Sequence, residues 1–255
     1  MIRPRIKALV AAAMLVVSGA ALADITIGVI APLTGPASGL GIPVGNQVKL
    51  WPKEMAGEKL NVIVLDDASD PTQGVTHAKR FVTQDKVDII MGSVATPVAA
   101  AIAQVADEAK TPQLSWSPVA LPAGKDKWTF RMPQSTAVMG YAVLEHMKKH
   151  GIKSVGFLGY NDAYGEAWLV DFKPMAERAG LKFGPAERFA RADTSVTGQA
   201  LKLLAANPDA ILVVASGSGA AMPEMALRER GYKGSVYQTH AAATRDLIRV
   251  GGKLV

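Results

Sequence analysis

Short runs rich in Val and Ile alternate with longer helix-like stretches along almost the whole chain, and this alternation constrains the fold more than any other feature. Runs of this length and composition are typical of buried strands. They cover residues 25–30, 62–65, 87–91, 155–158, 211–215 and 235–238. The helices expected between them cover residues 44–55, 71–83, 97–109, 136–150, 164–179, 196–206 and 220–230. Repeated strand and helix predict an α/β protein with parallel sheets and right-handed crossovers.

Local signals mark several helix ends. Asp70 stands directly before Pro71, so an N-cap acceptor precedes a proline at the first helical position. Pro52 and Pro174 fall inside expected helices, where proline removes a backbone donor and clashes with the preceding turn. We therefore expect a kink or an early stop at both prolines.

The first 23 residues have the order of an export signal. A positive head with Arg3, Arg5 and Lys7 precedes an apolar core over 8–17, and small residues follow at Ala21 and Ala23. The core is shorter than the roughly 20 residues that span a bilayer. The chain has no Cys, which excludes a lipid anchor at a cleavage-site cysteine. We expect a signal peptide over 1–23 and a soluble protein in the periplasm.

Charge and composition exclude several classes of function. The formal net charge of +6 falls by three units when the signal peptide leaves, which is too small to indicate nucleic-acid binding. His146 and His150 are four residues apart, but two lysines stand between them and no acid is near, so no metal site is predicted. No Ser, His and acid occur in a recognisable catalytic setting. The sequence therefore predicts no cofactor, no metal and no catalytic residue.

Polar residues and a tryptophan follow two of the first-half strands. Ser93 and Thr96 lie where a strand ends and a helix begins, and a helix N-terminus attracts carboxylates. The alternative is that Thr96 only caps its helix. Trp116 and Ser117 follow the next strand, where ligands of open α/β sheets bind, although a Trp is also often a core residue.

The second half repeats this pattern at two further strand ends. Tyr164 opens a helix behind Asp162, which can cap it, and Ser216 follows the strand over 211–215. The glycines over 35–41 also follow a strand, but their spacing does not match a dinucleotide fingerprint, so they indicate a tight turn.

Together, these segments resemble the leucine/isoleucine/valine-binding family, the type I periplasmic binding proteins of hydrophobic amino-acid ABC importers. The resemblance runs from residue 25 to about 252 and is carried by residues 25–41, 64–82, 87–118 and 156–168. It implies two Rossmann-like lobes with parallel sheets, a ligand in the cleft between them and closure by hinge motion. It also implies permease subunits of an ABC importer as partners.

The resemblance assigns roles to five positions. Thr96 matches a hydroxyl that takes the ligand carboxylate, Ser117 lies near a backbone contact to the ligand, and Tyr164 matches a second-lobe tyrosine. Leu40 replaces an aromatic residue of the first lobe. His240 falls roughly where amino-acid binders place an acid for the ligand ammonium.

A histidine at that place bears on the ligand class. A buried ammonium needs a paired acceptor, and His supplies one poorly. The ligand is thus expected to be a branched-chain or other hydrophobic amino acid, or an aromatic or aliphatic acid without an amine. Glu224 or Asp246 could supply the missing acid in three dimensions.

The strand and helix series restarts after residues 128–133, which suggests two lobes over 24–133 and 134–255. One continuous doubly wound sheet is the alternative. Members of the family are longer, so the C-terminal part of the second lobe is expected to be missing. A ligand-sensing module of the same fold is the other functional candidate, and an enzyme is the least favoured.

We predict that export removes residues through Ala23, because Ala21 and Ala23 occupy the positions that signal cleavage reads. N-terminal sequencing of periplasmic protein should begin at Asp24. A start more than a few residues away, or retention in the cytoplasm, would contradict this prediction.

Overall fold

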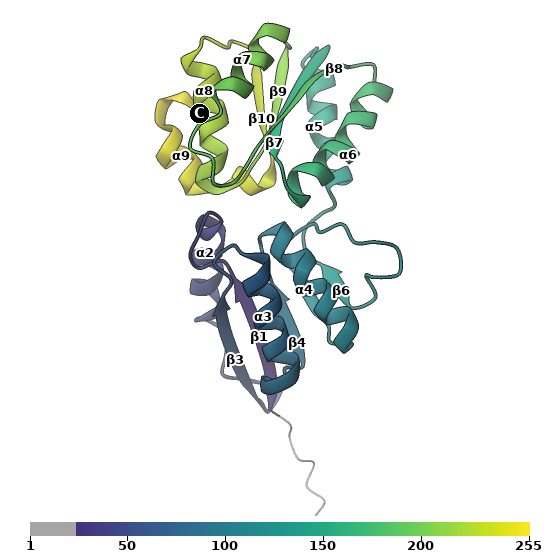
Figure 1. Cartoon of the computed structure of the whole chain (residues 1–255), viewed down its shortest axis with the longest axis vertical. Helices are drawn as coiled ribbons and strands as arrows, with labels where there is room; N and C mark the ends of the chain where they lie inside the picture. Colours follow the sequence, from purple (N-terminus) through teal and green to yellow (C-terminus); the bar gives the residue numbers. More distant parts are fainter. Residues whose placement is uncertain (1–23) are drawn as a thin grey trace, which may run out of the picture.

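The computed structural model describes residues 24–255, and the predicted signal peptide over 1–23 lies outside the described residues. Figure 1 shows two lobes, one above the other, each built around its own sheet. The α/β prediction is confirmed, and the strands form two sheets rather than one continuous sheet.

The first sheet has six strands in the order β2-β3-β1-β4-β5-β6. All neighbouring strands pair in parallel except β2, which is antiparallel to β3. Their bounds are β1 Ile25–Ala31, β2 Glu54–Met55, β3 Glu58–Asp66, β4 Ile89–Gly92, β5 Gln113–Ser115 and β6 Thr129–Arg131.

The helices of this lobe are α2 Ser38–Val48, α3 Pro71–Arg80 with a π-helical turn over Phe81–Asp85, and α4 Thr96–Ala109. Phe81 is fully buried, and its ring lies 2.4 Å from where a Cβ on Gly28 would stand. Glycine at that point of β1 therefore lets the helical layer pack closely on the sheet.

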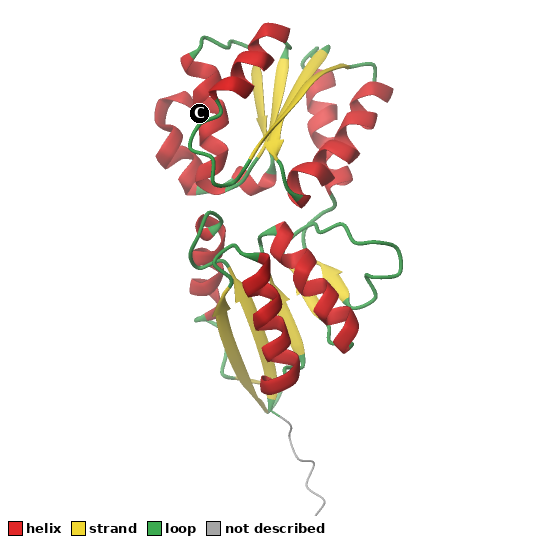
Figure 2. Ribbon diagram, in the orientation of Figure 1, coloured by secondary structure: helices red, strands yellow, loops and turns green. Residues whose placement is uncertain are grey.

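The second sheet has four parallel strands in the order β10-β9-β7-β8. Its strands are β7 Ser154–Tyr160, β8 Lys182–Phe189, β9 Ala210–Val214 and β10 Ser235–Gln238. Its helices are α5 Thr136–Lys149, α6 Ala163–Arg178, α7 Thr197–Ala206, α8 Ala221–Glu229 and α9 Arg245–Gly251, with short 3₁₀ turns over Gly217–Ala220, His240–Ala242 and Gly252–Leu254. Figure 2 shows helices on both sides of this sheet, which explains why every residue of β9 is buried.

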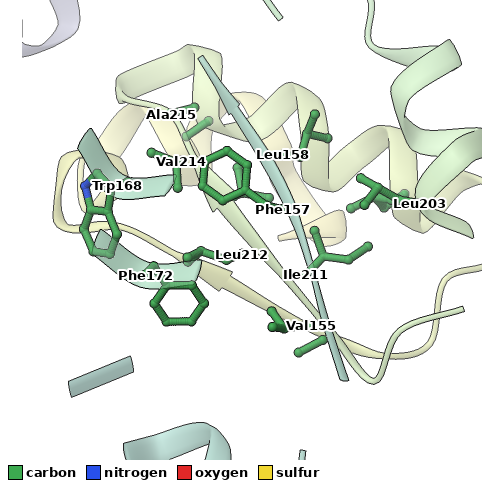
Figure 3. Packing of buried hydrophobic residues seen from close by; sticks show 14 of the residues in the cluster. Val155, Phe157, Leu158, Trp168, Phe172, Leu203, Ile211, Leu212, Val214 and Ala215 are labelled. Carbon is green, nitrogen blue, oxygen red and sulfur yellow. The ribbon is translucent and has the colours of Figure 1, made fainter. Parts of the chain in front are cut away.

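The core of the second lobe is one apolar cluster that joins the sheet to both helical layers (Figure 3). Phe157 and Leu212 extend from the central strands, and Trp168 and Phe172 reach them from α6. Leu203 of α7 is fully buried in the same cluster.

The elements differ from expectation at several points. Helix α2 starts six residues earlier than expected, and it ends at Val48, so the early stop expected at Pro52 is observed. Pro174 lies inside α6, which continues to Arg178, so the helix does not stop early there. Strand β8 was missed because Gly184, Pro185 and charged residues interrupt its apolar pattern; it is an edge strand, where proline is tolerated.

The segment over 128–133 forms an edge strand of the first sheet before the chain enters the second lobe. β6 pairs with β5, and α5 begins five residues after β6 ends. Within residues 24–255, no helix combines the length and apolar character needed to cross a membrane.

We predict that Leu203→Ala lowers the free energy of unfolding by about 2–5 kcal/mol, because it leaves a cavity in a close-packed core. Leu201→Ala, on the same helix but 53% exposed, should change it by less than about 0.5 kcal/mol. Urea denaturation of both variants measures the difference. Equal losses would show that α7 does not pack as described.

Candidate functional site

The carboxyl ends of the strands in the two sheets face one cavity of 220 Å³ between the lobes. Of the eight predicted site residues, all but Ser93 line this cavity. The full lining is Leu40, Val94, Thr96, Trp116, Ser117, Pro118, Tyr164, Arg191, Ser216, His240, Ala241, Ala243 and Thr244. The structure thus brings together residues from Leu40 to Thr244, which are 204 positions apart in the sequence.

The first lobe contributes two buried hydroxyls, Thr96 at the start of α4 and Ser117 after β5. Thr96 and Ser117 are 2% and 0% exposed, and their hydroxyl oxygens are hydrogen-bonded to each other. Two hydroxyls that share one hydrogen bond leave a second O–H free to donate. The N-cap position of α4 is Ala95, and no side chain caps this helix. Thr96 is therefore not the cap of its helix.

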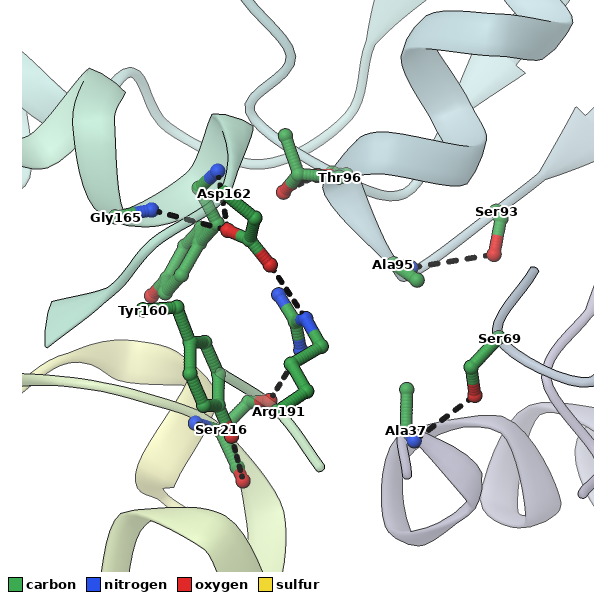
Figure 4. Close-up of polar contacts among 12 residues, drawn as sticks. Ala37, Ser69, Ser93, Ala95, Thr96, Tyr160, Asp162, Gly165, Arg191 and Ser216 are labelled. Carbon is green, nitrogen blue, oxygen red and sulfur yellow. Dashed lines mark hydrogen bonds and ion pairs between the residues drawn. The ribbon is translucent and has the colours of Figure 1, made fainter. Parts of the chain in front are cut away.

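Ser93 does not line the cavity, which corrects its place among the predicted site residues. It is fully buried, and its Oγ donates to Asp67 Oδ2 at 2.8 Å. The same oxygen accepts the Ala95 N–H at 3.2 Å, as Figure 4 shows. The side chain therefore faces the interior of the lobe. It supports the loop that leads into α4 rather than the ligand space.

Asp67 is the buried acid beneath this loop. It is fully buried, and besides the Ser93 hydroxyl it accepts the Ser69 N–H at 2.8 Å. Burial raises the pKa of Asp67 above its ordinary value, although the hydrogen bond from Ser93 opposes the rise.

In the second lobe, Asp162 positions Tyr164. Asp162 Oδ1 accepts the N–H groups of Tyr164 and Gly165, so it caps α6 as the sequence indicated. The Tyr164 hydroxyl donates to Thr239 Oγ1 at 2.7 Å, and Tyr164 is 3% exposed. Burial raises the pKa of Tyr164 well above its usual range, so the side chain stays a neutral phenol.

Arg191 is a lining residue that sequence reasoning missed. Its Nε donates to Asp162 Oδ2 at 2.6 Å, its Nη1 donates to Ser216 Oγ at 3.1 Å, and its guanidinium carbon lies 4.1 Å from the centre of the Tyr160 ring (Figure 4). These contacts hold the guanidinium at the cavity wall. Arg191 follows β8, so recognising that strand was the one signal that could have indicated it.

The remaining walls are apolar, aromatic or neutral. Leu40 of α2 and the half-buried Trp116 come from the first lobe, and His240 comes from the second. Tyr164 and His240 meet edge to face, with ring centroids 6.0 Å apart. Partial removal from water lowers the pKa of His240 below its usual value, which favours the neutral imidazole.

Neither of the two acids considered from sequence lines this cavity. Glu224 is held by Gln238 Nε2 at 3.0 Å and by Arg228, and Asp246 is bound to Arg249 beside an adjoining cavity. Within residues 24–255, no group of three or more His, Cys, Asp or Glu side chains is arranged to hold a metal ion.

Comparisons with known proteins agree with this geometry. A family model described as periplasmic binding protein matches residues 24–254. A crystal structure of an extracellular ligand-binding receptor from Rhodopseudomonas palustris HaA2 is 52% identical and has a TM-score of 0.89; the match covers 91% of this chain and 65% of that one. The shared fold confirms the expected two-lobed architecture.

The names of two more distant relatives state a ligand or a ligand class. A solute-binding protein of an ABC transporter from Rhodopseudomonas palustris BisB5, solved in complex with 3,4-dihydroxybenzoic acid, is 26% identical with a TM-score of 0.80, over 91% of this chain and 66% of that one. Leu/Ile/Val-binding protein homolog 3 of Brucella melitensis is 28% identical over 92% of this chain and 66% of its own length. The chain therefore spans slightly less than two thirds of these relatives, and they are binding proteins rather than enzymes.

We predict that Asp67→Asn removes a pH-dependent loss of stability. Because the pKa of Asp67 is raised, the folded protein holds this proton more tightly than the unfolded chain does. The contribution of Asp67 to the free energy of unfolding is therefore lost as pH rises from about 4 towards 7. Urea denaturation across this range should show the variant gaining stability relative to the unmodified protein as pH rises.

Asp209 supplies a control of opposite sign. Hydrogen bonds from the backbone of Lys153 and from Ser154 lower the pKa of Asp209, so its contribution is lost as pH falls. Asp209→Asn should therefore lose stability relative to the unmodified protein as pH rises. If Asp67→Asn behaved in the same way, its assigned pKa direction would be wrong.

Proposed function

The chain belongs to the periplasmic binding protein family, and on this premise we propose that it captures a small apolar carboxylate without an amine between its lobes over 24–133 and 134–255. The proposal rests mainly on one observation. Among the residues that line the cavity there is an arginine, Arg191, but neither Asp nor Glu.

This charge pattern favours an anion. A ligand carboxylate can accept the free hydroxyl proton of the Thr96 and Ser117 pair, next to the uncapped N-terminus of α4. Arg191 has five N–H donors, and its described hydrogen bonds to Asp162 and Ser216 leave others for a ligand. Because Asp162 already pairs with this guanidinium, a ligand carboxylate would be held by hydrogen bonds from Arg191, from the hydroxyl pair and from the N-terminus of α4 rather than by an unpaired cation.

An α-ammonium group finds no such partner. Asp162 is occupied by the α6 N-terminus and by Arg191, and His240 is held towards its neutral form. An ammonium buried here would lack a carboxylate, which costs several kcal/mol. The free acid avoids this cost and still uses the polar groups around Thr96.

The walls of the cavity suit an aromatic acid. Trp116 and Tyr164 offer ring faces or edges from opposite lobes, and such contacts add to the burial of apolar area. The dihydroxybenzoic acid in the structure of the 26% identical relative supports this class. The name of the Brucella relative supports a hydrophobic amino acid as the second candidate.

In the cell, we propose that the protein works in the periplasm and delivers its ligand to the permease subunits of an ABC importer. The relative with dihydroxybenzoic acid is described as a solute-binding protein of an ABC transporter, which supports this role. A sensing role for the same fold predicts a different partner. Permease and ATPase genes beside this gene would support transport, and a kinase or regulator gene there would support sensing.

We predict that 3,4-dihydroxybenzoate binds more tightly than leucine, and that catechol, the same ring without the carboxylate, binds much more weakly than the acid. Isothermal calorimetry on the purified protein measures all three. Thr96→Val should weaken binding of the acid by about 1–3 kcal/mol, because a buried acceptor loses a donor.

Thr76→Val is the matched control, since Thr76 lies on the exposed side of α3 and its hydroxyl bonds only to the Thr72 carbonyl. It should leave the affinity unchanged. Tight leucine binding without any response to the aromatic acid would contradict the proposed ligand class. Equal affinity for catechol and the acid would contradict the carboxylate seat.

A further inference from the structure

The two lobes touch beside the ligand cavity, at the first turns of α2 and α9. A second cavity, of 560 Å³, lies between these helices. It is lined on one side by Gly39, Leu40, Ile42 and Pro43, and on the other by the residues from Ala243 to Asp246. Leu40, Ala243 and Thr244 line both cavities. The contact between α2 and α9 is therefore continuous with the ligand site.

Gly39 and Asp246 approach each other closely between these two helices. A Cβ atom on Gly39 would stand 2.5 Å from Asp246 Oδ2 and 3.6 Å from its Cγ, and contacts under 3.0 Å require a shift. The carboxylate is also held from behind, since its Oδ1 accepts Arg249 Nε at 3.0 Å and Nη2 at 2.9 Å. Moving Asp246 aside therefore disturbs this pair, in which the Arg249 side chain is 69% exposed.

The position of the Asp246 carboxylate near the start of α2 is also electrostatically favourable. This helix has no acidic residue in its first turn and no side-chain cap. The partial positive charge at a helix N-terminus attracts a carboxylate, and here the carboxylate comes from the other lobe. Attraction and close packing thus act at the same point.

Backbone conformation does not explain the glycine at position 39. Gly39 lies within α2 and does not have a positive φ, so another residue could adopt its backbone angles. Glycine is also unfavourable within a helix. Gly198 is likewise the second residue of its helix, α7, yet nothing lies within 4 Å of its missing Cβ. The neighbour that distinguishes Gly39 is Asp246.

We propose that Gly39 and Asp246 form a closure contact that fixes the separation of the lobes and thereby limits the size of ligand the cleft accepts. This inference rests on the proposed function, because it concerns closure around a ligand in the 220 Å³ cavity. Both residues act as positioning residues, since neither lines that cavity. A ligand that holds the lobes further apart loses the contact and binds less tightly.

Side chains of increasing size at position 39 test the proposal. Gly39→Ala should weaken binding of 3,4-dihydroxybenzoate at least about fivefold in calorimetry, and Gly39→Leu should weaken it further. The melting temperature of Gly39→Ala should stay equal or rise, because alanine is the better helix former. Gly198→Ala is the control and should leave the affinity unchanged. Unchanged affinity in Gly39→Leu would overturn the proposal.

A double variant separates this contact from a local effect on α2. Asp246→Ala removes the group that the new Cβ meets, so Gly39→Ala should cost little affinity when it is measured against Asp246→Ala alone. If Gly39→Ala costs as much affinity in that background, the loss comes from α2 itself and the assigned contact is wrong.

A cross-link tests the contact without depending on any ligand. The chain contains no Cys, so Gly39→Cys with Asp246→Cys offers only one possible disulfide. The sulfur introduced by Asp246→Cys would stand near the present Cγ, 3.6 Å from the Cβ position of residue 39, so a small adjustment brings the two sulfurs within bonding reach. Mild oxidation should cross-link this pair, and more slowly the control pair Gly39→Cys with Ile248→Cys, because Ile248 is exposed on α9.

The two readouts separate failure of this inference from failure of the proposed function. If 3,4-dihydroxybenzoate does not bind but the pair cross-links faster than its control, the ligand class is wrong and the contact stands. If the acid binds while the pair cross-links no faster than its control, the contact is wrong and the ligand class stands.

Discussion

Parallel pairing is the constraint on which the rest of this structure depends. Because neighbouring strands run in the same direction, the segments that follow β4, β5, β7 and β9 all emerge at the cleft side of their sheets. The polar residues that follow these strands therefore meet at one cavity without any special arrangement of the loops. The crossover helices begin at the same edge, so α4 and α6 present their N-termini there. The gathering of helix N-termini, which attract anions, at the cleft is a consequence of this topology.

Sequence reasoning placed residues correctly where they directly follow a recognisable strand. Thr96, Ser117 and Ser216 were predicted in this way and line the cavity, and the expected α/β fold followed from the same apolar runs. It failed at Ser93, because the sequence does not show that this hydroxyl turns inwards to the buried Asp67. It also failed at Arg191, whose supporting strand β8 lacks an apolar pattern. Whether Glu224 or Asp246 reaches the cavity depends on how α8 and α9 pack against the rest of the chain, which one sequence does not reveal.

A small network of hydrogen bonds holds the Arg191 guanidinium at the cleft. Asp162 uses one oxygen to cap α6 and the other to pair with Arg191, so one acid links the position of Tyr164 to that of the guanidinium. Tyr160 supports the network from below through its ring and through reciprocal hydrogen bonds with the Ser216 backbone, both 3.3 Å long. A change in any of these residues would move the aromatic wall and the cation together. The second-lobe half of the site is therefore one mechanical unit, whereas the first-lobe half depends on the separate support of Asp67 and Ser93.

The composition of strand β8 also affects whether copies of this protein can pair with one another through their sheets. It lies at an outer edge of the second sheet, where unpaired backbone groups can recruit a strand from another chain. Pro185 has no N–H to offer such a strand, and charged side chains at Lys182, Glu187 and Arg188 disfavour its approach. The irregular composition that hides β8 from pattern analysis thus protects the edge from intermolecular sheet growth, which matters for a protein that folds without disulfides in a crowded compartment.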